Sequence, residues 1–243
     1  MKIEIIIICI LMIALVGCKQ KEPEVITPNE TTETNYTQPI EVIDKSGTNI
    51  MFTRESIVAT TDDYNLLLNT DSVADTIYLL NGNDLKLDGV LISSLFKEVD
   101  MIKLIAIREN ATIYNNGLVN NFGVYNNSQT IIKTTKISDK ITLIPTYSKG
   151  FTDDSSILVE VKDDNSFVYF SDVNLNYITV KGIKADVIKL DECVSDIDFF
   201  VLVNPKIVVY NNYCTNMTAL LDILNIKHYS SPVNINLNRL EKW

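Results

Sequence analysis

The sequence predicts an α/β domain in which sheets are covered by helices. Along the chain, short apolar and β-branched runs alternate with segments whose apolar residues recur at helical spacing. This alternation is typical of layered α/β folds, because a sheet buries its apolar face under helices. The segment 46–243 is long enough to bury one sizeable core, so we expect a single domain there.

The first half of this domain is expected to begin with a β-hairpin. Two apolar or β-branched runs, 57–60 and 65–69, lie on either side of Asp62 and Asp63, which favour a turn. The run 89–93 is mostly apolar, as in a buried strand. The other elements expected here are helices at 73–80 and 100–107, and strands at 112–115, 123–125, 130–133 and 140–144.

The second half is expected to contain another hairpin and a closing helix. The strands 156–161 and 167–170 flank the turn sequence Asp-Asp-Asn-Ser. The segment 215–224 has helical spacing, and Thr215 or Asn216 is expected to cap its start. The apolar face of this helix consists of Met217, Leu220, Leu221 and Leu224. The other strands expected here lie at 187–190, 207–210 and 228–230.

The N-terminal segment 1–17 has the layout of a secretory signal peptide. A short charged start precedes the apolar run 5–16, which is too short for a bilayer span of roughly 17–25 residues. The run ends in Leu-Val-Gly-Cys, which resembles the box where bacterial lipoproteins are cleaved and acylated. We therefore expect lipidation of Cys18 by fatty acids such as palmitate, and anchoring on the extracytoplasmic side of the cell membrane. The alternative is a plain signal peptide with an incidental cysteine, because Cys9 is a second cysteine in this region.

The segment 18–45 is expected to be a disordered tether that starts at the lipidated cysteine. It is polar, rich in Thr and Glu, and contains Pro23, Pro28 and Pro39. A segment of this composition cannot bury enough apolar surface to offset the entropy lost on ordering. The tether would separate the lipid from the domain 46–243.

The charge of the chain excludes one class of partner. Its net charge is −10 at pH 7, and removal of Lys2 and Glu4 with the signal peptide leaves that value unchanged. Proteins that bind nucleic acids present clusters of Lys and Arg to the phosphates, and no such cluster stands out here. We therefore expect no nucleic-acid partner.

Two cysteines remain beyond Cys18, namely Cys193 and Cys214. Two cysteines do not make a disulfide framework, although they can pair in an oxidising compartment. The sequence does not place their Cα atoms within bonding distance, so the redox state of this pair stays open.

Several segments match a known family in order and spacing. The segment 65–71, Asn-Leu-Leu-Leu-Asn-Thr-Asp, is similar to a strand that ends in Asp-Thr-Gly, and 155–161 with 167–172 is similar to a hairpin that ends in Gly-Asp. Further similar segments are 73–80, 87–93, 185–190, 205–209 and 226–229. Together they resemble the metallo-β-lactamase-like hydrolases, most of all the hydrolase-like domain of competence DNA-uptake channel proteins. The resemblance implies an αββα sandwich, with two mixed sheets flanked by helices.

The matching positions in this sequence lack the histidines of that family's metal motif. Its Thr-His-x-His-x-Asp-His pattern falls on residues that include no histidine, namely Ser93, Ser94, Phe96, Glu98 and Val99. The later His-His-Gly-Ser pattern falls on Glu192, Cys193, Val194 and Ser195. Asp172 alone stands where the family has a bridging carboxylate, and Glu98 stands where it has its catalytic aspartate. Because catalytic zinc needs three protein ligands, the resemblance implies a degenerate site.

Two further groups of residues could supply chemistry outside this motif. Asp172, Glu98, Glu192 and Cys193 would lie near one another if the resemblance holds, and oxygen ligands suit Ca²⁺ or Mg²⁺. Acidic residues at strand ends are usually just solvated, so we expect no metal and no cofactor. The only histidine, His228, is interpreted as a surface or edge-strand residue, because no Gly-x-Ser-x-Gly turn accompanies it.

The sequence thus favours a membrane-anchored lipoprotein whose hydrolase-like domain is catalytically inactive and has a binding or structural role in the cell envelope. Its partners would be the membrane, through the lipid, and another envelope protein. The first alternative is a diverged metal-dependent hydrolase that acts on phosphodiesters or related substrates. The second alternative is a solute-binding lipoprotein with a ligand in the former active-site cleft.

Lipidation gives a direct test of the N-terminal assignment. We expect Cys18→Ser to leave an uncleaved precursor that takes up no labelled fatty acid, because the acylated thiol and the cleavage signal are both lost. Metabolic labelling followed by electrophoresis measures both effects. Normal acylation of the variant would rule out the lipoprotein assignment.

Overall fold

The structure of the chain is a computed structural model. It describes residues 47–53, 56–70, 72–92, 99–115, 127–146, 156–170, 182–190, 193–211, 214–231 and 233–240. All of these belong to one compact unit, Glu41–Trp243. The signal peptide, Cys18 and the segment up to residue 45 lie outside the described residues, so their assignments stay predictions. Within the described ranges, no helix is long and apolar enough to cross a membrane.

Seven of the described strands form a first sheet, in the order β14-β1-β2-β3-β4-β5-β6. Neighbouring strands from β14 to β3 are antiparallel, and those from β3 to β6 are parallel. The strands are β1 Asn49–Phe52, β2 Ser56–Thr60, β3 Asn65–Thr70, β4 Gly89–Ile92, β5 Thr112–Asn115, β6 Ser128–Thr130 and β14 Val233–Asn236.

Seven further described strands form a second sheet, in the order β13-β12-β11-β10-β9-β8-β7. Here β7 to β10 are antiparallel neighbours, and β10 to β13 are parallel. The strands are β7 Thr135–Lys136, β8 Ile141–Thr146, β9 Ser156–Lys162, β10 Ser166–Phe170, β11 Val187–Leu190, β12 Ile207–Tyr210 and β13 Lys227–Ser230.

The described helices connect the parallel strands. They are α2 Val73–Gly82, α3 Val99–Glu109, α5 Ile197–Val203 and α6 Thr215–Ile223. Ser72 caps α2, because its side chain accepts a hydrogen bond from the Asp75 backbone N–H at 3.2 Å. Asp196 caps α5 in the same way, through the Asp198 backbone N–H at 2.9 Å. The helix α5 ends at Asn204, which takes the left-handed conformation that suits a helix end.

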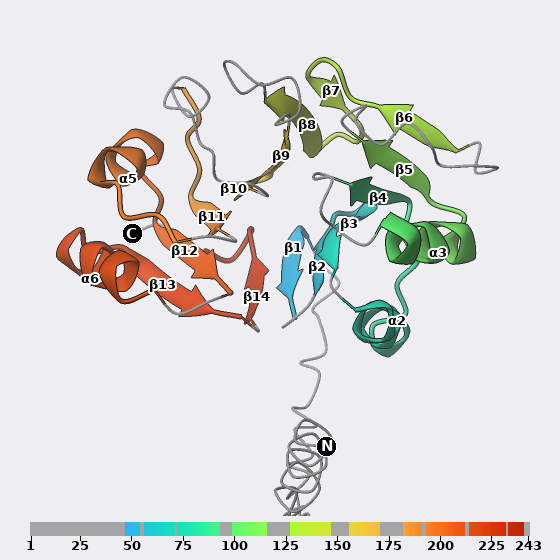
Figure 1. The fold of residues 1–243 in the computed structure, drawn as a ribbon, viewed down its shortest axis with the longest axis horizontal. Helices are drawn as coiled ribbons and strands as arrows, with labels where there is room; N and C mark the ends of the chain where they lie inside the picture. Colours follow the sequence, from blue (N-terminus) through green and yellow to red (C-terminus); the bar gives the residue numbers. More distant parts are fainter. Residues whose placement is uncertain are drawn as a thin grey trace, which may run out of the picture. The chain divides into compact units, whose positions relative to one another are not determined.

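The two sheets and the helices form four layers, α–β–β–α (Figure 1). The helices α2 and α3 pack on the outer face of the first sheet, through residues such as Leu80 and Ile105. The helices α5 and α6 pack on the outer face of the second sheet, through residues such as Phe200 and Leu221. Each helical layer buries an apolar stripe, which is the arrangement that the alternation of strands and helices predicts.

The inner faces of the two sheets share one apolar layer, which we call the inner layer. Phe52 of β1 meets Phe167 of β10 edge to face, with ring centroids 5.9 Å apart. Residues of the first sheet such as Leu66 and of the second sheet such as Val159 are fully buried in it. Shortening a leucine of this layer such as Leu66 to Ala would cost roughly 2–5 kcal/mol of the free energy of unfolding.

Polar residues close one edge of the inner layer. Lys140, just before β8, donates from Nζ to Asp62 in the β2–β3 turn at 2.8 Å, and to Asp163 in the β9–β10 turn at 2.6 Å. The Thr48 hydroxyl, just before β1, also donates to Asp163. We call these four residues the amino-edge clasp, because they hold together the amino ends of β3, β8 and β10.

The clasp keeps its carboxylate charged. Burial of Asp163 opposes ionisation, but hydrogen bonds from Lys140, Thr48 and Asn238 outweigh burial and hold the pKa of this carboxyl below its usual value of 3.8. The hydrogen bonds from Lys140 to Asp163 and then to Asp62 raise the pKa of the lysine in turn.

Most elements that the sequence predicts are present. Both hairpins are confirmed, and the strands 112–115, 187–190 and 207–210 have the predicted bounds. The apolar face predicted for α6 is also confirmed, since Met217 and Leu221 are buried and Leu220 and Leu224 pack partly against the same cluster. The expected strand 123–125 lies outside the described residues.

Two predictions are wrong, and four elements were not predicted. The strand expected at 130–133 is wrong beyond Thr130, where β6 ends. The helix α6 is preceded by Cys214, which makes no side-chain capping hydrogen bond, so the predicted caps are wrong. The elements β1, β7, α5 and β14 were not predicted. For α5 the reason is composition, because Ile-Asp-Phe-Phe-Val-Leu-Val has the residues of a strand and becomes a helix through its Asp196 cap and its burial.

The clasp predicts a specific pH dependence of stability. Because the pKa of Asp163 is lowered in the folded chain, its carboxylate stabilises the fold above the unfolded-state pKa, and this contribution is lost as the pH falls through the lower folded-state value. We expect Asp163→Asn to lower the melting temperature at pH 7, and the difference from wild type to shrink below about pH 4. Thermal scans from pH 2 to 7 measure this. The exposed Asp139→Asn is the control, and an equal loss for Asp163→Asn at every pH would contradict the ionic role.

Candidate functional site

The parallel strands of both sheets point to one edge of the molecule. The amino-edge clasp holds the amino ends of β3 and β10 together. Since β3 to β6 are parallel to one another, and β10 to β13 likewise, their carboxyl ends all lie at the opposite edge. We call this the carboxyl edge. Ligands of α/β sheets bind outside the carboxyl ends of parallel strands, so this edge is the candidate site.

A tyrosine pair packs against the inner layer beside Gly89, the first residue of β4. The hydroxyls of Tyr64 and Tyr114 are 2.7 Å apart. Burial, followed by the hydrogen bond with Tyr114, raises the pKa of Tyr64 well above its usual value, so its phenol stays neutral. Gly89 lies against both rings, and a Cβ at this position would approach the Tyr64 hydroxyl to 2.9 Å. The two hydroxyls therefore satisfy each other within the apolar layer.

Asn69, next to last in β3, brings an amide to the inner face of the carboxyl edge. The pairing of β2 with β3 shifts between Ile57 and Val58, and this irregularity places Asn69 opposite Ile57. Because paired residues share a face and Ile57 belongs to the inner layer, the side chain of Asn69 faces inward. The residue is 5% exposed. Among the described residues, its Oδ1 is the one buried side-chain polar atom with no hydrogen-bond partner.

A cluster of hydroxyls fixes the end of β3 to the helical layer. The Oγ of Ser56 lies 3.1 Å from Oγ1 of Thr70 and 2.8 Å from Oγ1 of Thr76, and the two threonine oxygens are 2.8 Å apart. Thr70 also donates to the Ser72 carbonyl at 2.8 Å. This cluster is buried on the side of α2, so it positions β3 without facing the inner layer.

Lys189, next to last in β11, brings an amine to the same edge. It is paired with Tyr169 of β10 and Val209 of β12, both of which belong to the inner layer, so its side chain faces inward as well. Its exposed fraction is 0%. The Nζ donates to the Leu190 carbonyl at 2.8 Å. Sequence reasoning missed both Asn69 and Lys189; the signal for Lys189 was a single charge inside the apolar run Val-Ile-Lys-Leu.

A disulfide joins two loops at the carboxyl edge. Cys193 follows β11 and Cys214 follows β12, and the structure bonds them, with their Cα atoms 5.8 Å apart. This settles the pairing that the sequence left open. Cys193 was a candidate metal ligand, and that candidacy is corrected here, because a sulfur in a disulfide has no thiolate to offer a metal.

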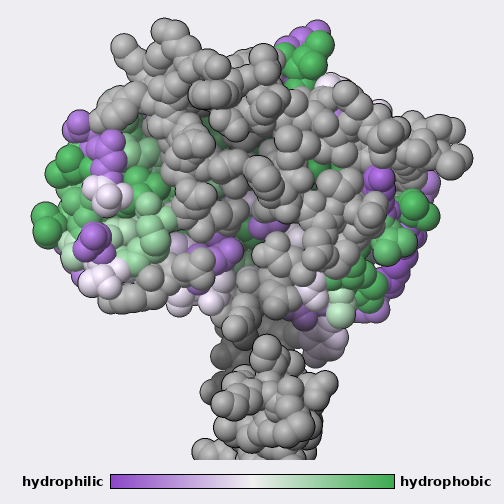
Figure 2. Space-filling view, in the orientation of Figure 1, coloured by the Kyte–Doolittle hydropathy of each residue, from purple (hydrophilic) through white to green (hydrophobic). Residues whose placement is uncertain are grey.

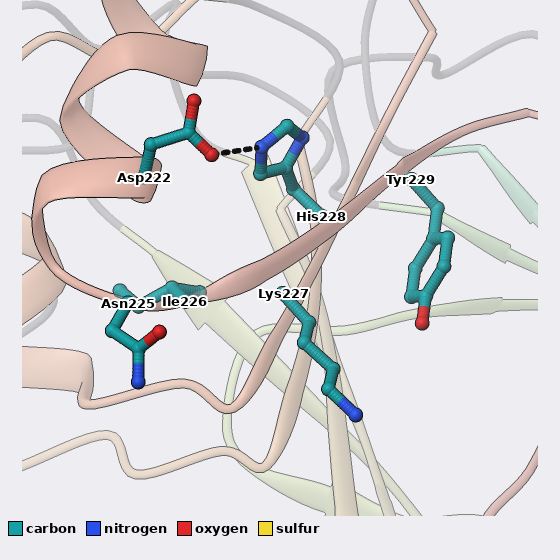
Figure 3. Close-up of a pocket in the computed structure, with 6 residues that line it drawn as sticks. All are labelled: Asp222, Asn225, Ile226, Lys227, His228 and Tyr229. Carbon is teal, nitrogen blue, oxygen red and sulfur yellow. Dashed lines mark hydrogen bonds and ion pairs between the residues drawn. The ribbon is translucent and has the colours of Figure 1, made fainter.

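The only histidine lies on the other face of the second sheet. His228 is paired with Val208 of the α5/α6 cluster, and β13 is an edge strand, which confirms the edge-strand interpretation. Its Nε2 is 3.1 Å from Asp222 Oδ1, and its Nδ1 is 3.3 Å from the Tyr210 hydroxyl. Figure 3 shows the Asp222 carboxylate pointing at the ring, in a surface pocket of about 380 Å³. Both ring nitrogens of His228 therefore lie within hydrogen-bond distance of side chains in the same chain.

The remaining candidate residues are placed only in part. Val99 is the first residue of α3, and Val194 is buried in the α5/α6 cluster. Ser195 is exposed, in the stretch before α5. The positions Ser93, Ser94, Phe96, Glu98, Asp172 and Glu192 lie outside the described residues and stay predictions.

Solved structures share this fold at low sequence identity. The metallo-beta-lactamase fold protein YhfI from Bacillus subtilis has a TM-score of 0.58 and 10% identity, over 77% of this chain and 97% of that chain. A variant of the CmlA beta-hydroxylase has a TM-score of 0.55 and 8% identity, and the match covers 78% of this chain and 53% of that chain. The short form of human tRNase Z has a TM-score of 0.51 and 10% identity, and the match covers 78% of this chain and 99% of that chain. No protein-family model and no curated protein matches the sequence. The chain therefore has a metallo-β-lactamase-type fold, as the resemblance implies, whereas the likeness to competence proteins stays a prediction.

The described residues include no ligand set for the metal that this fold implies. A catalytic zinc needs three protein ligands from His, Cys, Asp or Glu. Within the described ranges, no group of three such residues is placed to hold a metal ion. Cys193 is bonded to Cys214, His228 lies on another face, and the inner face of the carboxyl edge carries the amine of Lys189. No catalytic step through a metal is derived from this arrangement.

The disulfide predicts a loss of stability on reduction. Closing a loop with a sequence separation of 21 residues restricts the unfolded chain and is worth about 3 kcal/mol of the free energy of unfolding. We expect the double variant Cys193→Ser/Cys214→Ser to melt roughly 6–12 °C below wild type, measured by calorimetry. Reductant should lower the melting temperature of wild type and leave the double variant unchanged. A wild-type chain that melts at the same temperature with and without reductant would contradict this role.

Proposed function

We propose that this chain is a lipid-anchored protein of the cell envelope whose metallo-β-lactamase-type domain binds another envelope component without catalysing hydrolysis. One observation carries the proposal. Cys193, at a position where the resemblance implies a metal-binding histidine, is bonded to Cys214. A covalent bond at this position removes a ligand and fixes the loop that would carry it.

The same disulfide supports an extracytoplasmic location. Disulfides form and persist in oxidising compartments and are rare in the reducing cytosol. This agrees with the signal-peptide layout and the Leu-Val-Gly-Cys box before the tether. The two features are independent, because one lies in the N-terminal segment and the other in the domain.

A binding role is supported by apolar side chains on the outer helices. On α5 and α6, Ile197, Val201 and Ile223 are exposed, and on α3 Leu104 and Ile107 are exposed. Figure 2 shows apolar surface on both flanks of the domain. Grouped apolar residues at a surface mark sites of protein contact more often than scattered ones do. These helix faces are therefore the surfaces on which we expect the envelope partner.

The second candidate function is a diverged metal-dependent hydrolase. The observation that favours it is the fold itself, which the chain shares with a tRNase Z at a TM-score of 0.51. It would require ligands from positions outside the described residues, such as Asp172, Glu98 and Glu192.

Metal content and activity separate the two candidates. We expect the purified chain to hold well under one zinc, manganese or iron per molecule, and to hydrolyse phosphodiesters and β-lactams no faster than buffer, because nothing would lower the pKa of a bound water towards 7. Elemental analysis and chromogenic substrates measure this. The hydrolase candidate would prevail if about one metal per chain were lost, together with activity, in Asp172→Ala and retained in the exposed control Asp139→Ala.

A further inference from the structure

The Cys193–Cys214 bond joins two cysteines that differ in their surroundings. Cys193 is exposed, in the stretch 193–196 before α5, which is neither helix nor strand. Cys214 is 8% exposed and packs in the α5/α6 cluster. A thiol in solution can therefore approach the bond from the side of Cys193, whereas packing covers the side of Cys214.

The backbone fixes Cys214 at the start of α6. Its carbonyl accepts hydrogen bonds from the Thr218 backbone N–H at 2.9 Å and from the Thr218 hydroxyl at 3.1 Å. Cys214 is the N-cap residue of this helix, but its side chain makes no capping hydrogen bond. The first N–H groups of a helix have no partner within the helix and carry partial positive charge. A thiolate released at Cys214 would therefore be stabilised by the start of α6.

These two features favour the same direction of thiol–disulfide exchange. In this reaction a thiolate attacks one sulfur of the disulfide, and the other sulfur leaves as a thiolate. The rate depends on access to the attacked sulfur and rises as the leaving thiolate becomes more stable. Attack at Cys193 meets both conditions. Attack at Cys214 meets neither, because Cys214 is buried and Cys193 precedes a helix whose start is already capped by the Asp196 carboxylate.

We propose that Cys193 is a site of thiol–disulfide exchange, at which an external thiol forms a mixed disulfide with this chain. The bond from the external sulfur to Cys193 Sγ forms as the Cys193–Cys214 bond breaks, and the electron pair of the broken bond stays on Cys214 as a thiolate. The external reactant is a thiolate, from a small molecule or from an exposed cysteine of a protein. One disulfide replaces another, so no oxidant is consumed. This reactivity goes beyond the proposed binding role and does not depend on it.

Trapping the mixed disulfide tests this assignment. The full-length chain is incubated with reduced glutathione, the free thiols are blocked with N-ethylmaleimide, and the peptides are mapped by mass spectrometry. We expect glutathione on Cys193 and maleimide on Cys214, with the reverse pattern at about a tenth of that level or below, because attack requires access to the sulfur. A second arm uses thioredoxin with its resolving cysteine replaced, and it distinguishes a protein thiol from a small one. An adduct on Cys193 with either reagent supports the proposal.

The unfolded chain is the matched control. In denaturant both the difference in exposure and the helix α6 are lost, so we expect glutathione on both cysteines. The proposal is overturned if the native chain carries the adduct equally on both cysteines, mainly on Cys214, or on neither with both reagents. It is also overturned if the rate does not rise with glutathione concentration, because the reaction then waits for unfolding. A metal found in the purified chain would contradict the proposed function and leave this result unchanged.

Discussion

The shared inner layer determines where this chain can place chemistry. Both inner faces are apolar along most of their strands, so a polar side chain there loses its hydration unless the protein supplies a partner. Polar groups that face inward are therefore tolerated mainly at strand ends. Asn69 and Lys189 follow this constraint, because each is the next-to-last residue of its strand. Packing is therefore sufficient to explain why these two residues lie near strand ends.

The two edges of the inner layer are held together by different interactions. At the amino edge, the single positive charge of Lys140 is shared between the carboxylates of Asp62 and Asp163, and these ion pairs link the turns of the two sheets. At the carboxyl edge the strands lead into the loops before α5 and α6, and the Cys193–Cys214 bond joins these loops. Ion pairs thus join the turns at the amino edge, whereas a covalent bond joins the loops at the carboxyl edge.

The layers of this fold could be predicted from the sequence, but the candidate site could not. Hairpin turns such as Asp62-Asp63 and buried strands such as 187–190 depend on local residue types, and these predictions are confirmed. The inward orientation of Asn69 depends on a shift in pairing between two strands, because simple alternation after Leu68 would turn Asn69 outward. The disulfide likewise depends on β11 and β12 being neighbours in the sheet, which residue spacing does not reveal.

The disulfide acquires a structural explanation if the metal has been lost, as proposed. A metal ion bound by side chains from several strand ends cross-links the loops that carry its ligands. Here the Cys193–Cys214 bond supplies a cross-link between the loops that follow β11 and β12. This bond cannot activate water, because a disulfide offers neither a Lewis-acidic centre nor an acidic proton. The fold can then keep its stability while losing the chemistry, and its outer helices remain available for binding.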